Sequence, residues 1–359
     1  MSRATRAVIA LSALRHNLQR AREAAPHSRI MAVVKANGYG HGLVRAAEAL
    51  SGADAYGVSS LDEAAELRDA GITAPIVLLE GFTRASDLSA VREYGVQCVL
   101  HHRSQLALLE ADRGEAPIAV WLKLDTGMHR LGFSVEDFPA ILGRVLDCAS
   151  VAKPLRLITH LAQADDPDSA ETPRQIDLLH GAAADLDAEL SIANSAGVLA
   201  WPQSHVDWVR PGVMLYGVAP FVAGTGPEHA LRPAMTLSSE LIAVNRYRRG
   251  DRIGYAGTWR CPEDMHVGVV AIGYGDGYPR HAPSGTPVLL NGRRVPLIGR
   301  VSMDMLSVDL RSQPQARVGD PVVLWGEGLP VEEVARMAGT IGYELLCGVA
   351  PRVKVEVRA

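Results

Sequence analysis

The stretch Ile30-Met31-Ala32-Val33-Val34-Lys35 decides the fold of this chain. Five apolar residues run without alternation up to the lysine, a pattern typical of a strand that is buried on both faces, as in a parallel sheet or barrel. A glycine-rich turn with Gly38, Gly40 and Gly42 follows at once. We therefore expect Lys35 at the carboxyl end of the strand, where α/β barrels and open α/β sheets bind their ligands.

Similar strand-like runs recur up to residue 210 and alternate mostly with helical patterns such as Ser60 to Ala70 and Thr172 to Leu186. Such alternation implies parallel pairing with right-handed crossovers, and eight steps close naturally into a (β/α)8 barrel. An open parallel sheet stays possible, because periodicity alone does not exclude it. The runs lie near residues 30–34, 55–58, 75–80, 96–100, 118–124, 155–159, 190–193 and 206–210.

After about residue 230 the pattern changes to short strand-like runs separated by Gly, Pro and Asp, which predicts a mainly β domain with one helix at 331–338. We place the barrel at residues 1–230 and the second domain at 231–359. Residues 1–11 could add a strand to the second domain, with Ser12 capping the helix that follows. The β runs lie near 235–244, 266–273, 287–290, 294–298, 305–310, 321–325 and 353–357.

Composition excludes several classes of protein. Hydrophobic residues make up 48% of the chain and charged residues 21%, as in an ordinary globular protein. The formal net charge of -4, with no lysine-rich run, argues against nucleic acid or an anionic membrane as partner and favours small-molecule ligands. No apolar stretch reaches membrane length and no early segment reads as a signal peptide, so we expect a cytoplasmic protein.

Neither the cysteines nor the histidines indicate a metal site. His101-His102 have no carboxylate or cysteine at ligand spacing, and adjacent histidines in a loop are usually solvated. The four cysteines lack the close pairs of a zinc site or a dense disulfide framework, so we expect no metal and reduced, packed thiols. They are Cys98, Cys148, Cys261 and Cys347.

The residues that follow the first strand resemble a family signature. Lys35-Ala36-Asn37-Gly38-Tyr39-Gly40-His41-Gly42 is similar to the motif of alanine racemases, whose lysine carries pyridoxal 5′-phosphate (PLP) as an internal aldimine. A lone lysine at a strand end would more often be a solvated terminus, but the surrounding motif favours a cofactor lysine. Few other candidates exist, since the only lysines are Lys35, Lys123, Lys153 and Lys354.

A second motif, Lys123 to Gly132, follows the strand-like run at 118–122. Arg130 offers a planar fork suited to a carboxylate, although residue types alone also allow an ion pair with Asp125. The resemblance implies that Arg130 binds the substrate carboxylate and that Lys123 is carbamylated and holds this arginine in place. Carbamylation reverses the charge of the lysine, so it would remove the repulsion between Lys123 and Arg130.

The loops after the seventh and eighth runs carry Asn194-Ser195 and Arg210-Pro211-Gly212-Val213. Barrel enzymes often bind phosphate there through backbone N–H groups, a hydroxyl and a helix N-terminus, although an Asn-Ser pair can also be an ordinary helix cap. The resemblance implies that the cofactor phosphate is bound by Ser195, Gly212, Val213, Tyr39 and Tyr343.

Arg210 matches the family arginine that faces the pyridine nitrogen of the cofactor. A protonated arginine donates to this nitrogen, so it disfavours the pyridinium and weakens the electron sink. The chain departs from many relatives at Ser191, where they carry a histidine, and this could alter the tuning of Arg210. His160 follows the sixth run, and the resemblance places it among the cofactor-binding residues, beside the catalytic tyrosine, although a lone histidine at a strand end is more often structural.

Tyr255, within Arg252 to Thr258, matches the second catalytic base of the family, although the residue types alone favour a packed tyrosine. Racemisation needs proton transfer on opposite faces of one planar carbanion, so a single fixed lysine is not sufficient. A tyrosine has an ordinary pKa of about 10 and needs a cationic or histidine partner to act as a base at neutral pH. Our candidate for this partner is His160.

The resemblance spans nearly the whole chain and implies a homodimer with two composite sites. Each site would take Lys35 from one subunit, for the D-specific face of the substrate, and Tyr255 from the other, for the L-specific face. The backbone of Met303 is expected near the substrate carboxylate, again from the other subunit. The residues expected in the entry corridor are Asp165, Tyr274, Arg280 and Arg300.

The expected activity is therefore interconversion of L-alanine and D-alanine, for peptidoglycan or for alanine catabolism. One alternative is a PLP-dependent amino-acid decarboxylase of the same architecture, against which Tyr255 and Arg210 argue. The non-enzyme alternative is a PLP-carrier protein. Such carriers resemble single barrels, so the second domain argues against this alternative.

Overall fold

The computed structural model describes residues 4–114 and 116–359. The chain divides into two compact units, which we call the barrel unit and the C-terminal unit. The barrel unit consists of Arg15–Leu215 and Pro220–Ala223, and the C-terminal unit of the residues up to Leu14, Tyr216–Ala219 and Gly224–Ala359. Within the described ranges, no helix is both long and apolar enough to cross a membrane.

Eight parallel strands of the barrel unit form a closed barrel, which confirms the predicted fold. Closure comes from the pairing of the first strand with the last, Arg29 with Trp208 and Ile30 with Val209, so an open sheet is excluded. The strands are β2 (Arg29–Val33), β3 (Ala55–Val58), β4 (Ile76–Leu78), β5 (Val96–Leu100), β6 (Val120–Lys123), β7 (Leu155–Ile158), β8 (Ala188–Ser191) and β9 (Trp208–Val209).

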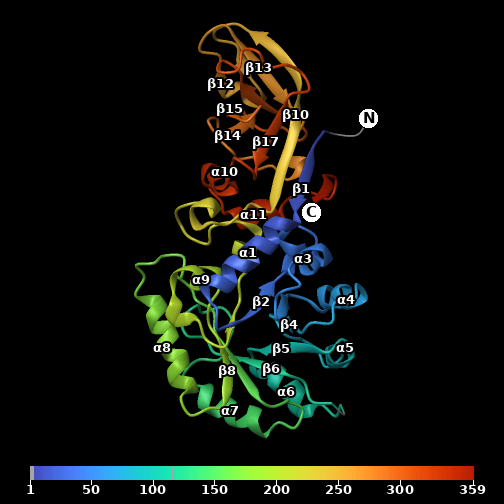
Figure 1. Cartoon of the computed structure of the whole chain (residues 1–359), viewed down its shortest axis with the longest axis vertical. Helices are drawn as coiled ribbons and strands as arrows, with labels where there is room; N and C mark the ends of the chain where they lie inside the picture. Colours follow the sequence, from blue (N-terminus) through green and yellow to red (C-terminus); the bar gives the residue numbers. More distant parts are fainter. Residues whose placement is uncertain (1–3, 115) are drawn as a thin grey trace. The chain divides into compact units, whose positions relative to one another are not determined.

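The helices of this unit lie around the outside of the strands (Figure 1). Inside the barrel, apolar side chains from neighbouring strands pack together, and Trp121 meets Trp208 edge to face with 5.7 Å between the ring centroids. The helices are α2 (Lys35–Tyr39), α3 (Leu43–Ala49), α4 (Leu61–Asp69), α5 (Asp87–Glu93), α6 (Arg103–Ala111), α7 (Phe138–Asp147), α8 (Glu171–Ala183) and α9 (Ser195–Ala200), with 3₁₀ turns η1 (Pro202–Ser204) and η2 (Val213–Tyr216).

Short polar side chains explain where some of these helices begin. Ser60 caps α4, because its hydroxyl accepts a hydrogen bond from the Glu63 N–H at 3.2 Å. The expectation for Ser12 is wrong: α1 (Leu11–Ala24) starts directly after the preceding strand, and Ser12 lies inside the helix.

The C-terminal unit is built on an eight-stranded sheet in the order β13-β16-β15-β14-β17-β10-β1-β18. The long strand β10 runs antiparallel beside β1, the first strand of the chain (Figure 1). On its other side, β1 pairs in parallel with β18, the last strand of the chain. The strands are β1 (Arg6–Ala10), β10 (Met235–Tyr247), β13 (Met265–Val270), β14 (Pro287–Leu290), β15 (Arg293–Ile298), β16 (Leu306–Asp309), β17 (Pro321–Trp325) and β18 (Lys354–Arg358).

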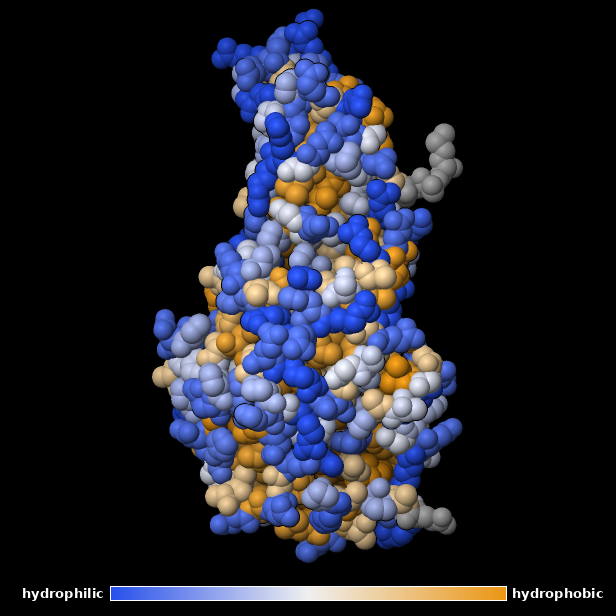
Figure 2. All heavy atoms as spheres, viewed as in Figure 1, coloured by the Kyte–Doolittle hydropathy of each residue, from blue (hydrophilic) through white to orange (hydrophobic). Residues whose placement is uncertain are grey.

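Several shorter elements complete this unit. Helix α10 spans Val331–Ala338 as the sequence predicts, whereas the small hairpin at residues 252–260 and the helix α11 were not expected from the sequence. Hydrophilic residues cover most of the visible surface at the end of the unit where β12 and β13 lie (Figure 2). The remaining elements are η3 (Gly226–His229), β11 (Arg252–Ile253), η4 (Tyr255–Gly257), β12 (Trp259–Arg260), η5 (Tyr274–Asp276) and α11 (Gly342–Cys347).

Candidate active site

The chain makes a left-handed turn immediately after Lys35. Ala36, Asn37, Gly38 and Tyr39 have φ angles of 56°, 54°, 60° and 51°. Left-handed helical backbone costs L-residues about 1–2 kcal/mol each, so three of these four residues are strained. Contacts around the turn must therefore hold it.

Two hydrogen bonds fix this turn from outside. The Ala36 N–H donates to Glu63 Oε1 at 2.7 Å, and the Leu43 N–H donates to Asn37 Oδ1 at 2.9 Å. The first bond ties the turn to α4 and the second ties it to the start of α3. Lys35 is thus held half-buried at the carboxyl end of β2, as the sequence predicts.

Three of the residues expected to bind phosphate meet at the carboxyl ends of the strands. The Gly212 N–H donates to Ser195 Oγ at 2.8 Å, and a Cβ at Gly212 would lie 2.6 Å from the Tyr39 hydroxyl. Val213 follows and opens η2. Asn194 is the cap of α9, which leaves the Ser195 hydroxyl for Gly212. Hydroxyls and a helix start together suit a bound phosphate.

Arg210 is a buried guanidinium beside these groups, with only 4% of its surface exposed. It donates to Ser191 Oγ at 2.6 Å, to the Thr159 carbonyl at 2.5 Å and to the Ile192 carbonyl at 3.1 Å. Burial lowers the pKa of Arg210 to about 9, so it remains protonated at neutral pH. The departure at Ser191 thus supplies a direct acceptor for Arg210.

His160 contacts the same guanidinium. Arg210 Nη2 lies 3.3 Å from His160 Nδ1, which fits a tautomer whose Nδ1 accepts and whose Nε2 carries the proton. Burial lowers the pKa of His160 well below its ordinary value, and Arg210, Lys123, Arg130 and Lys35 lower it further. His160 is therefore neutral at physiological pH.

Lys123 closes β6 and is only 9% exposed. Burial lowers the pKa of its amine to about 7, with Arg210 and Arg130 acting in the same direction and Asp125 opposing them. A substantial fraction of Lys123 is therefore neutral at physiological pH. An ordinary lysine would be almost fully charged.

Arg130 lies exposed on the loop after β6. It has no hydrogen bond or ion pair with any residue in 4–114 or 116–359. The Asp125 carboxylate instead accepts the N–H groups of Gly127 and His129, both at 3.0 Å. The alternative of an Asp125–Arg130 ion pair is therefore wrong, and the guanidinium is available to a ligand.

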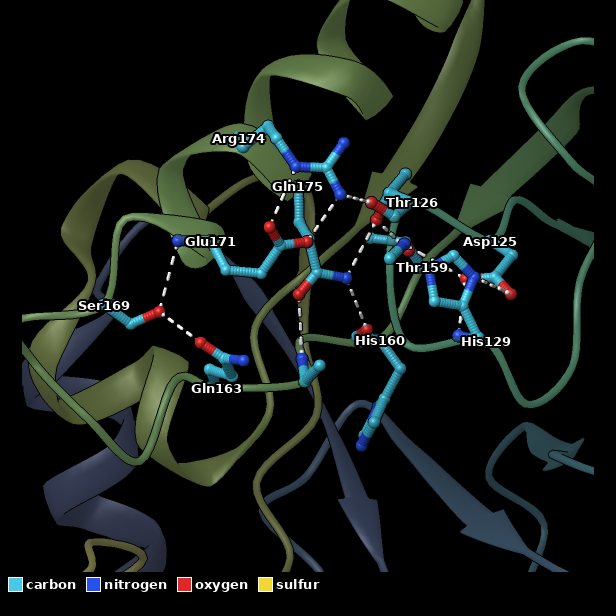
Figure 3. Close-up of polar contacts among 12 residues, drawn as sticks. Asp125, Thr126, His129, Thr159, His160, Gln163, Ser169, Glu171, Arg174 and Gln175 are labelled. Atoms are coloured by element: carbon cyan, nitrogen blue, oxygen red, sulfur yellow. Dashed lines mark hydrogen bonds and ion pairs between the residues drawn. The ribbon is translucent and has the colours of Figure 1, made fainter.

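A buried network lies directly behind His160 (Figure 3). The hydroxyls of Thr126 and Thr159 are 2.8 Å apart. Gln175 of α8 donates to Thr126 Oγ1 at 3.2 Å and to the His160 carbonyl at 3.1 Å. The sequence analysis did not identify Gln175, and the available signal was a glutamine on the buried face of a predicted helix, beside Thr172, Ile176 and Leu179.

The other predicted site residues belong to the C-terminal unit, apart from Asp165, which is exposed on the barrel unit. Tyr255 is 66% exposed and Met303 is 54% exposed. Tyr343 is half-buried near the start of α11. The remaining three are exposed: Tyr274, Arg280 and Arg300.

Two of these residues lie on turns that pack against each other within the C-terminal unit. The Tyr274 N–H donates to the Ser302 carbonyl at 3.0 Å, and the Gly275 N–H donates to the Met303 carbonyl at 2.9 Å. The exposed side chains of Tyr274 and Met303 therefore extend from two turns whose backbones are hydrogen-bonded to each other.

Comparison with family models covers most of the chain. Residues 9–220 match the model "Alanine racemase, N-terminal domain", and residues 234–357 match "Alanine racemase, C-terminal domain". Two curated relatives, both named alanine racemase, agree. The protein from Nitrosococcus oceani is 56% identical over 347 residues and covers 97% of each chain, and that from Shewanella denitrificans is 54% identical over 354 residues and covers 98% of each.

A solved structure is similar over the full length. The biosynthetic alanine racemase from Pseudomonas aeruginosa has a TM-score of 0.96 and 46% sequence identity, and the match covers 99% of this chain and 100% of that one. The barrel and the mainly β domain are therefore shared with a solved member of the same family.

Proposed function

We propose that this chain, which belongs to the alanine racemase family, interconverts L-alanine and D-alanine at the carboxyl ends of its barrel strands. One observation carries the placement of the site. Burial depresses the pKa of His160, after β7, and the charges of Arg210, Lys123 and Lys35, which come from three other strand ends, depress it further. Residues remote in sequence thus share one electrostatic environment, as perturbed groups do in catalytic sites.

The cofactor that we propose is pyridoxal 5′-phosphate, and the barrel residues fit it. Lys35 offers an amine, and the hydroxyls of Tyr39 and Ser195 with the Gly212–Val213 backbone offer a place for phosphate; a Cβ at Gly212 would fill part of this place. When bound, the cofactor withdraws electrons from the substrate and makes its α-proton acidic. Tyr343 of the C-terminal unit would complete the phosphate contacts.

Arg210 is assigned to the pyridine nitrogen of the cofactor. Its charge persists at neutral pH despite its lowered pKa, and Ser191, Thr159 and Ile192 fix its orientation. A fixed donor at that nitrogen keeps the ring neutral and limits side reactions.

Two bases move the α-proton in this proposal. Lys35 exchanges it on the D-specific face, and Tyr255 of the partner subunit exchanges it on the L-specific face. The 66% exposure of Tyr255 supports supply to a second copy, because a group that acts in another subunit must be accessible. The neutral His160 is the proposed hydrogen-bond partner of that tyrosine.

Arg130 is assigned to the substrate carboxylate, since its guanidinium has no acidic partner among the described residues. Lys123 is assigned as the carbamylated lysine that holds Arg130. Its lowered pKa favours this, because the neutral amine attacks carbon dioxide, forms an N–C bond and loses one proton. The product is an anion beside Arg130 and Arg210, which relieves the repulsion among three cations.

The functional assembly that we propose is a homodimer with two composite sites. Each protomer would supply Met303 as well as Tyr255 to the site of the other. Asp165, Tyr274, Arg280 and Arg300 would line the entry corridor, and all four are exposed.

Neither alternative accounts for the chain as well. A PLP carrier needs no second domain, whereas both domain models of the racemase family match here. A decarboxylase has no use for a second base on the opposite face. The product D-alanine would serve peptidoglycan, and the reverse direction would serve alanine catabolism.

An assay in deuterated water tests the activity. Purified protein loaded with PLP is incubated with L-alanine, and D-alanine and α-deuterium are followed together. Deuterated D-alanine supports the proposal, whereas an amine with loss of carbon dioxide supports the decarboxylase. Bound cofactor without either product would favour the carrier.

A further inference from the structure

We infer that Gln175 is a positioning residue for this reaction: its side-chain amide ties the loop that carries Arg130 to the strand end that carries His160. This inference rests on the proposed function, because it concerns the residues assigned to substrate binding. Gln175 has no exposed surface, so it touches neither substrate nor cofactor and acts only through other residues.

The amide of Gln175 makes three hydrogen bonds (Figure 3). Its Oε1 accepts from the Ala162 N–H at 2.8 Å, and its Nε2 donates to the His160 carbonyl at 3.1 Å and to Thr126 Oγ1 at 3.2 Å. Both amide protons and the carbonyl oxygen are thus used. Loss of the amide would leave two backbone groups, the Ala162 N–H and the His160 carbonyl, without this partner.

These bonds join two different strand ends. His160 and Ala162 belong to the segment after β7, whereas Thr126 begins the loop that leads from β6 to Arg130. The hydroxyls of Thr126 and Thr159, 2.8 Å apart, add a second link at the same level. One residue of α8 therefore sets the spacing of two loops.

The loop of Arg130 also touches the first turns of α8 directly. Arg174 donates to the Thr126 carbonyl at 3.2 Å and forms an ion pair with Glu171 at 2.6 Å. A Cβ at Gly127 would collide with Glu171 and would lie 2.8 Å from Arg174 Nη2. The backbone at Gly127 therefore lies against the helix, and Gln175 holds it there from the buried side.

The same network reaches Arg210 in one further step. Arg210 Nη2 donates to the Thr159 carbonyl at 2.5 Å and lies 3.3 Å from His160 Nδ1. Thr159 and His160 both belong to the network of Gln175. Loss of Gln175 should therefore loosen the loop of Arg130 and the segment of His160, while Lys35 and the phosphate contacts stay in place.

A second buried glutamine provides a matched control. Gln105 of α6 is 3% exposed, accepts from the His101 N–H at 2.8 Å and donates to the Phe82 carbonyl at 3.0 Å. It ties the ends of β4 and β5 just as Gln175 ties those of β6 and β7. Among the described residues, the hydrogen bonds of Gln105 reach neither Arg130 nor His160.

The test compares Gln175→Met with Gln105→Met, since methionine keeps the length of the side chain without the amide. For the PLP-loaded enzyme, Gln175→Met should raise KM for alanine about tenfold in both directions, because the carboxylate contact is displaced. It should also weaken binding of propionate, which is alanine without its amine, by a similar factor. Bound cofactor and its absorbance should be unchanged, and Gln105→Met should leave both constants within about twofold of wild type.

Hydrogen exchange supplies a readout that does not depend on activity. Gln175→Met should speed exchange in peptides covering residues 125–133 and 159–163, and Gln105→Met should speed it only near residues 80–82 and 101–105. Faster exchange with unchanged KM and propionate affinity would overturn the inference. So would equal effects of the two variants, since they would indicate general destabilisation.

The two proposals fail in different ways. A wild-type protein that binds propionate but does not racemise alanine would refute the proposed function. Propionate affinity and hydrogen exchange would still decide whether Gln175 positions the carboxylate site.

Discussion

At the scale of single residues, the site depends on one buried lysine among arginines. Lys123 has its pKa lowered to about 7 chiefly because it is buried, and then because Arg210 and Arg130 are near. The folded state binds fewer protons than the unfolded state between this pKa and the ordinary lysine value. An unmodified Lys123 therefore opposes folding increasingly as pH falls from about 10.4 towards 7.

Carbamylation removes this conflict and gives the first prediction. Protein equilibrated with ¹³C-labelled bicarbonate should show a carbamate signal of Lys123 by carbon NMR, since burial lowers the pKa of this amine to about 7 and Arg210 and Arg130 lie near it. The signal should vanish in Lys123→Met. It should persist in the control Lys153→Met, because the amine of Lys153 donates a hydrogen bond to the Val145 carbonyl and is not assigned to the site. A signal that survives Lys123→Met would contradict the assignment.

The sequence predicted the positions of the proposed site residues better than it predicted the residues that support them. Lys35, Lys123, His160 and Arg210 each follow an apolar run, so position alone indicated strand ends. Gln175 could not be identified in this way, because a glutamine on a helix reveals its hydrogen bonds only when the loops it joins are in place.

At the scale of elements, the barrel strands were predictable, because a short apolar run without alternation in a globular protein is typical of a strand buried on both faces. The hairpin of β11 and β12 was not, since its strands have two residues each. The left-handed turn at 36–39 was not predictable either. Hydrogen bonds to the Glu63 carboxylate and from the Leu43 N–H hold its conformation, and the sequence pattern does not reveal either partner.

This turn gives the second prediction. Gly38→Ala adds a Cβ 2.9 Å from the Ala46 Cβ at a φ of 60°, so it meets both strain and crowding. Gly71→Ala is the control, because Gly71 has a φ of 83° but no atom within 4 Å of its added Cβ. Gly38→Ala should therefore lose more free energy of unfolding than the control, by about 1 kcal/mol or more, and should bind less PLP.

Denaturant unfolding of both variants and their cofactor content provide the measurement. Equal losses in unfolding free energy and full cofactor binding by Gly38→Ala would show that the turn tolerates a side chain. The proposed role of this turn in presenting Lys35 would then be wrong.

At the scale of the whole molecule, the two units carry different parts of the proposed chemistry. The barrel unit contains Lys35, Lys123, His160 and Arg210, whereas Tyr255 and Met303 are exposed on the C-terminal unit. A second copy of the chain would cover them and use Tyr255.

Subunit complementation gives the third prediction. Lys35→Ala and Tyr255→Phe should each be inactive alone, yet a refolded equal mixture should recover about a quarter of wild-type activity. Half of randomly paired dimers are mixed, and each mixed dimer has one intact composite site. A mixture of Lys35→Ala with Lys35→Met is the control and should remain inactive. No recovery in the first mixture would contradict shared sites.

The central claim is that Lys35 and Tyr255 serve opposite faces of the substrate. Its most direct test measures α-hydrogen exchange of each alanine enantiomer in deuterated water with PLP-loaded Tyr255→Phe. We predict that D-alanine still exchanges its α-hydrogen through Lys35, that L-alanine does not, and that neither enantiomer is converted into the other. Racemisation at the wild-type rate, or equal exchange of both enantiomers, would contradict the two-base account.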